Sequence, residues 1–147
     1  MFNLYNGELV WNEEQKLAYI KLLIYLAKSD NNPDAIEKVF IKKMMMRFSL
    51  PADSLVGLSV PKSLDDVYEV VRPIRGRTMA VDLLHTLWFA ASIDGVIADE
   101  EIKIIRSLAR ILNIDDDTVL VINNFVLDEL TFLQQAEDVL ETQNVRC

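Results

Sequence analysis

Residues 83–101 read LLHTLWFAASIDGVIADEE, and this stretch decides the fold class. Its first part carries apolar side chains at helical spacing, with Leu84, Leu87 and Ala91 on one face. Asp94-Gly95 follows, and glycine suits the left-handed position that ends many helices. The acidic run at residues 99–101 then stands where a helix N-terminus favours negative charge. The stretch therefore predicts a helix, a tight turn and a second helix.

The same kinds of signal extend through the rest of the chain. Asn12 and Gln15 form a capping-box pattern, Ser63 is a further N-cap residue, and Pro51 ends a helical segment. Apolar periodicity between these signals predicts an all-α single domain of about six to eight helices. The predicted helices span residues 12–30, 34–50, 63–72, 78–94 and 99–112, followed by a stretch at 115–147 that is split near residues 130–131.

The first eleven residues have a different pattern. Two short apolar-rich runs flank Asn6-Gly7, the dipeptide that a type I′ hairpin turn favours. The sequence predicts a short N-terminal β-hairpin here. Because an isolated hairpin is marginal in water, it should pack on the helical body through Phe2, Tyr5 or Trp11.

Aligning the chain with itself at an offset of 64 residues indicates an internal repeat. Over residues 22–50, the identical pairs under this shift are Leu23/Leu87, Ala27/Ala91, Asp30/Asp94, Glu37/Glu101 and Ile41/Ile105. The pattern predicts two antiparallel helical hairpins, at residues 12–50 and 78–114, within one domain spanning 1–147. Residues 51–77 would then form a connector that contains a helix, and residues 115–147 an acidic C-terminal helical segment.

The repeat places one Asp and one Glu at each inter-helix turn. If a pseudo-twofold brings the turns together, Asp30, Glu37, Asp94 and Glu101 form an oxygen-only cluster. Such a cluster suits a hard divalent cation, Ca²⁺, Mg²⁺ or Mn²⁺. The same residue types also stabilise the first turn of a helix with no metal present, so both interpretations stand at this point.

Charge and composition narrow the classes of partner. The chain has 15 basic and 23 acidic residues and a net charge of −8, which argues against nucleic acid and anionic membranes. Residues 115–147 contain one basic and eight acidic residues and so hold most of this excess. No apolar run is long enough to span a bilayer, and the first residues lack a secretory signal pattern. With Cys147 as the one cysteine, we expect a cytoplasmic protein.

Three further features are candidate functional positions. Arg72, Arg75 and Arg77 form a basic island that could bind an anion or an acidic partner segment, or could be solvated or pair with nearby carboxylates. His85, the single histidine, is expected to be structural, because a zinc site needs further His or Cys ligands. The run at residues 44–46 is Met-Met-Met, and helical geometry requires at least one of these side chains to be exposed.

The segment from Leu83 through the Asp94-Gly95 turn to Glu101, with the apolar helix after it, resembles the tellurite-resistance TerB-like family. The resemblance spans roughly residues 15–125; in the first unit Asn31 replaces the glycine and Pro33 enters the turn. It implies an all-helical cytoplasmic domain linked to tellurite and other stress responses. It also implies acidic turn positions that bind metal, here Asp30, Glu37, Asp94 and Glu101. It does not imply an established enzymatic activity.

Two functions follow as alternatives. One is a non-catalytic domain that binds a divalent cation or a partner through the acidic turns. The other is a structural protein–protein interaction module or homodimer without a metal site, which would use Trp88, the methionine run or the acidic C-terminal helices.

Overall fold

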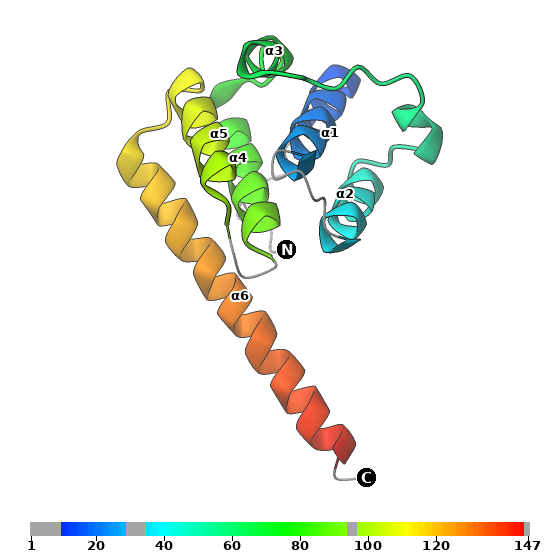
Figure 1. Cartoon of the computed structure of the whole chain (residues 1–147), viewed down its shortest axis with the longest axis vertical. Helices are drawn as coiled ribbons and strands as arrows, with labels where there is room; N and C mark the ends of the chain where they lie inside the picture. Colours follow the sequence, from blue (N-terminus) through cyan, green and yellow to red (C-terminus); the bar gives the residue numbers. More distant parts are fainter. Residues whose placement is uncertain (1–9, 29–34, 94–96, 146–147) are drawn as a thin grey trace.

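The computed structural model of the chain describes residues 10–28, 35–93 and 97–145 (Figure 1). Over these residues the fold has six α-helices, one short 3-10 helix and no strand, which confirms the all-α class. The elements are α1 (Glu13–Lys28), α2 (Ala35–Arg47), η1 (Ala52–Leu55), α3 (Leu64–Val70), α4 (Gly76–Ser92), α5 (Asp99–Ile111) and α6 (Asp116–Val145).

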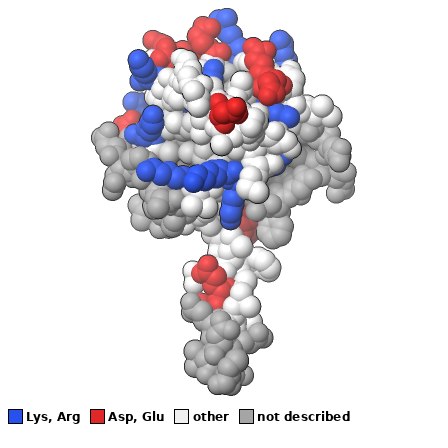
Figure 2. Space-filling model, turned by 90° about the vertical axis from the view of Figure 1, so that its right-hand side faces the viewer, with Lys and Arg blue, Asp and Glu red and all other residues white. Residues whose placement is uncertain are grey.

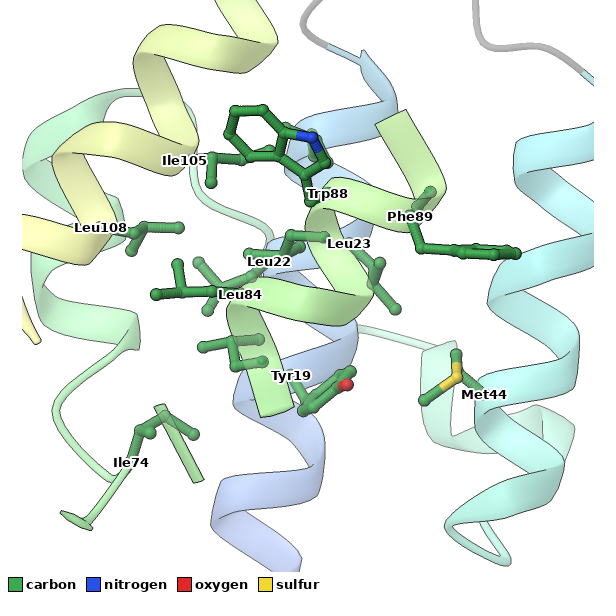
Figure 3. Packing of buried hydrophobic residues seen from close by; sticks show 14 of the residues in the cluster. Tyr19, Leu22, Leu23, Met44, Ile74, Leu84, Trp88, Phe89, Ile105 and Leu108 are labelled. Carbon is green, nitrogen blue, oxygen red and sulfur yellow. The ribbon is translucent and has the colours of Figure 1, made fainter. Parts of the chain in front are cut away.

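Helix α4 is the centre of the helical body. It packs against α1, α2, α5 and α6, and its residues 82–92 are all buried. A helix buried around its whole circumference needs neighbours on every side, because each exposed apolar face would cost free energy. Phe89 points toward α2 in Figure 3 and stacks on Phe40, with ring centroids 5.5 Å apart. The stretch that decides the fold class in the sequence is therefore also the core of the structure.

The predicted helix starts are confirmed where the structure describes them. At α1 the Asn12 side chain accepts from the Gln15 N–H at 2.8 Å, and the Gln15 side chain accepts from the Asn12 N–H at 3.0 Å. This reciprocal capping box satisfies two amides that the first helical turn leaves without partners. At α3 the Ser63 hydroxyl accepts from the Asp66 N–H at 3.3 Å.

Helices α2 and α5 end in the same way. Ser49 and Asn113 adopt positive φ values of 55° and 60°. In each case the N–H of the next residue donates to the backbone carbonyl five residues earlier. These are Schellman motifs, closed by the buried side chains of Leu50 and Ile114. Their positions are 64 residues apart, as are both ends of α2 and α5. These matching ends support the internal repeat, although its acidic turns contain residues 29–34 and 94–96, outside the described residues.

The C-terminal segment differs from its prediction. It forms one helix, α6, of 30 residues, so the predicted split near residues 130–131 is wrong. No glycine or proline interrupts this segment, and Thr131 satisfies its own hydroxyl by donating to the Leu127 carbonyl at 2.9 Å. Among the described helices, α6 included, none has the length and apolarity needed to cross a membrane.

The predicted N-terminal hairpin falls mostly on residues 1–9, which lie outside the described residues, so it stays a prediction. Trp11 does pack on the helical body, as expected. Its ring is buried 5.2 Å from the Tyr19 ring and 5.5 Å from the Phe48 ring, measured between centroids.

Candidate functional site

Of the four carboxylates predicted to bind a cation, Glu101 is the one whose side chain the structure describes. It lies in the first turn of α5 and is 2% exposed. Its Oε1 accepts from the Ala98 N–H at 3.1 Å, the bond of a helix N-cap. Leu23, Phe40 and Ala90 line a small cavity with it. Glu101 therefore has a structural role at the start of α5, whatever else it binds.

The other three predicted ligands are not placed by the structure. Asp30 and Asp94 lie outside the described residues, and Glu37 belongs to α2 but its side chain is not described. No group of three His, Cys, Asp or Glu side chains that could hold a metal occurs within the described part of the chain. Those side chains alone do not fit a cation, and the metal hypothesis depends on Asp30 and Asp94.

The arginine island makes local ion pairs. Arg72 pairs with Glu69 at 3.1 Å on the same helical stretch, and both side chains are well exposed. Arg77 lies 3.6 Å from Asp115, and this ion pair joins the start of α4 to the start of α6. The pKa of Asp115 is lowered, first by the hydrogen bond from Thr118 and also by Arg77. This arrangement agrees with pairing to nearby carboxylates; binding of a partner by Arg72, the exposed Arg75 or Arg77 stays a prediction.

A buried polar pair joins α4 to α6. The Nε2 atom of His85 lies 2.5 Å from Oε1 of Glu129, and the two side chains are 1% and 3% exposed. The ring of Phe125 packs edge-on against the imidazole, with centroids 5.3 Å apart. His85 is thus structural, as expected, but its partner was not foreseen. The sequence signal for a buried partner is Glu129 itself, because it is a charged residue on an otherwise apolar face of its helix.

A second buried polar group joins α4 to α1 and α2. Arg47, at the end of α2, donates to Asp82 at 2.9 Å, and the Asp82 side chain is 7% exposed. The Tyr19 hydroxyl bonds Thr86 on the next turn of α4. Burial raises the pKa of Tyr19, and the negative charge of Asp82 adds to this effect. Tyr19 therefore stays protonated in the folded chain and serves as a hydrogen-bonding group, not as a base.

The C-terminal half of α6 extends past the body, as Figure 1 shows. Among the hydrophobic side chains that the structure describes as packed against the core, Leu130 is the last one on α6. We call residues 131–145 the arm. Within the arm, Leu133, Val139 and Leu140 are 45%, 56% and 60% exposed. These are large apolar side chains whose exposure in one place indicates a binding surface.

The exposed stripe of the arm continues the face that α6 uses inside the body. Val119, Ile122 and Val126 are buried at alternating spacings of three and four residues. The same spacing leads through Glu129 to Leu133, Ala136 and Leu140. Apolar positions at alternating spacings of three and four residues are typical of a helix that packs against another helix. The body therefore provides a partner for the first half of this face, and the arm presents the second half to solvent.

An acidic side chain borders the stripe. At 100° per residue, Glu137 lies beside the line from Leu133 to Leu140, and it is exposed. From residue 128 to residue 145, α6 has no Lys or Arg. The red patch on the projecting part of Figure 2 belongs to this acidic segment. The arm is thus an amphipathic helix whose apolar stripe has a negatively charged border at Glu137.

Comparison of the chain with family models, curated proteins and solved structures gave no match. The resemblance to the TerB-like family therefore stays a prediction from the sequence.

Proposed function

We propose that the protein is a non-catalytic helical interaction module that binds a basic amphipathic helix with its arm. The observation that carries this proposal is the exposure of Leu133, Val139 and Leu140 on a helix that continues beyond the body. Helix-in-groove recognition uses apolar anchors one and two turns apart, and charge complementarity selects the partner. The acidic border of the stripe at Glu137, on a segment without lysine or arginine, selects a partner helix with lysine or arginine beside its apolar anchors.

A synthetic helical peptide with leucines seven residues apart and flanking lysines tests the proposal. We expect fluorescence anisotropy to show binding to the whole chain in the micromolar range, that is about −7 to −8 kcal/mol. Leu133→Ser/Leu140→Ser should weaken binding by about tenfold or more, since two buried leucines contribute more than 1.4 kcal/mol.

The matched control is Leu120→Ser/Leu127→Ser. These leucines are also seven residues apart on α6 and are 58% and 50% exposed, but they lie away from the stripe. The control should bind the peptide like the natural chain. Equal loss in both variants, or no binding by the natural chain at millimolar peptide, would contradict the proposal.

Cation binding at the acidic turns is a second proposal, as the resemblance to the TerB-like family implies. Its support in the structure is the burial of a carboxylate, Glu101, at the start of α5, seven residues after Asp94 in the sequence. If a cation binds, Ca²⁺, Mg²⁺ or Mn²⁺ should raise the melting temperature by mass action. Asp94→Asn/Glu101→Gln should remove that rise. No rise with any of the three ions, or the same rise in the variant, would refute the cation site.

A further inference from the structure

The outer face of α2 has the complementary pattern to the arm. Val39 and Met46, seven residues apart, are 52% and 78% exposed. Lys42 and Lys43 are exposed on opposite sides of the line between them, and Lys38 precedes Val39. Residues 38–47 contain four basic and no acidic residues. We call Lys38, Val39, Lys42, Lys43 and Met46 the α2 outer face.

The two surfaces match in spacing as well as in charge. Val39 and Met46 are two helical turns apart, about 10.5 Å along the axis, and so are Leu133 and Leu140. Lysines border the first pair, whereas Glu137 borders the second. When two such helices pack, the apolar anchors meet along the seam and opposite charges face each other at its edges. Met46 also suits a docking surface, because an unbranched thioether adapts to its partner.

The arm cannot reach α2 within one chain. In Figure 1, α2 lies at the opposite side of the body from α6, with α4 between them, and the arm points away from the body. Figure 2 views the body from the α2 side and shows Lys and Arg side chains across it, above the acidic patch of the arm. The two complementary surfaces are therefore presented in different directions, as surfaces that join separate molecules are.

We infer that the partner helix of the arm is the α2 outer face of a second copy of this chain. This inference rests on the proposed function of the arm. In a twofold dimer each arm packs on the α2 of the other copy, so the same contact is made twice. One helix pair of this length is small compared with stable interfaces, and the reciprocal arrangement doubles the buried area.

Charge reversal provides a test that few other arrangements would pass. Lys42→Glu/Lys43→Glu makes both surfaces acidic, and Glu137→Lys makes both surfaces basic. Each variant alone should therefore lose self-association. Mixed in equal amounts, one variant offers an acidic arm and an acidic α2, and the other offers a basic arm and a basic α2. Both contacts of the mixed dimer then join opposite charges, so the dimer should form again.

Sedimentation velocity over about 1 to 100 µM protein measures the association. The natural chain should dimerise in this range, and raising the salt from about 50 to 500 mM should weaken the dimer several-fold, because screening reduces the attraction of exposed charges. Lys62→Glu/Lys103→Glu is the matched control, since it reverses two exposed lysines outside the α2 outer face and should leave the dimer intact. Val39→Asp/Met46→Asp removes the anchors and gives a second, independent loss.

The outcomes are distinct. A natural chain that stays monomeric throughout, while it still binds the synthetic basic peptide, overturns this inference and leaves the proposed function standing. A natural chain that neither dimerises nor binds the peptide contradicts both this inference and the proposed function. A dimer that survives the charge reversals, or reversed variants of native helical content whose mixture stays monomeric, shows that α2 is not the partner.

Discussion

Replacing Glu129 by alanine is expected to lower the free energy of unfolding by about 3 kcal/mol, as loss of one member of a buried ionisable pair does. The substitution leaves His85, which is 1% exposed, without the carboxylate that now lies 2.5 Å from its Nε2. It also leaves a cavity between α4 and α6. Urea denaturation followed by circular dichroism measures the loss.

The double variant His85→Leu/Glu129→Met tests these two causes together. It removes both polar groups and keeps most of the side-chain volume, and such replacements are often close to neutral. The Nδ1 atom of His85 has no hydrogen-bond partner among the described residues, so the histidine itself is costly to bury. We expect the double variant to be clearly more stable than Glu129→Ala. A double variant no more stable than the single one would show that neither the unpaired histidine nor the cavity explains the loss in Glu129→Ala.

The position of this pair also matters for the arm. Glu129 is one residue before Leu130, the last hydrophobic side chain of α6 that the structure describes as packed against the core. The pair therefore fixes the point and direction in which the arm leaves the body. A chain with Glu129→Ala should keep the arm sequence but present it less precisely, so that binding through the arm is weakened even where the body stays folded.

Local signals in the sequence were sufficient for most of the fold. The capping box of Asn12 and Gln15 and the N-cap of Ser63 depend on residues three positions apart, and both are confirmed. The methionine run is confirmed as well, because Met44 and Met45 are buried and Met46 is exposed. These features need only helical geometry, which the sequence pattern contains.

Features that depend on distant residues were not predictable in this way. His85 and Glu129 are 44 positions apart, and Arg47 and Asp82 are 35 apart. Only the packing of α4 against its neighbours brings them together. The exposed arm was missed for a related reason. Its apolar stripe has the same periodicity as a helix face that packs on the core. The pattern alone does not show that α4, the helix on which the first half of α6 packs, ends before the stripe of α6 does.

The second large effect is expected at Asp82. Asp82→Ala removes the buried carboxylate that Arg47 contacts at 2.9 Å, and we expect the free energy of unfolding to fall by about 2 kcal/mol. The value lies below that for Glu129 because Arg47 is 37% exposed, so water replaces part of the lost interaction. Since Arg47 ends α2, the variant should also loosen the attachment of α2 to α4.

An exposed ion pair of the same chain provides the comparison for Asp82. Glu69→Ala breaks the contact with Arg72, whose side chain is 73% exposed, and such pairs contribute about 0.5 kcal/mol or less. Thermal or urea unfolding of the two variants should therefore differ severalfold in the loss of stability. Asp82→Asn should fall between them, because the amide oxygen still accepts from Arg47 but without the charge. If Asp82→Ala costs no more than Glu69→Ala, the Arg47–Asp82 contact does not hold α2 against α4, and the apolar contacts of Phe40 and Met44 with the core are enough to do so.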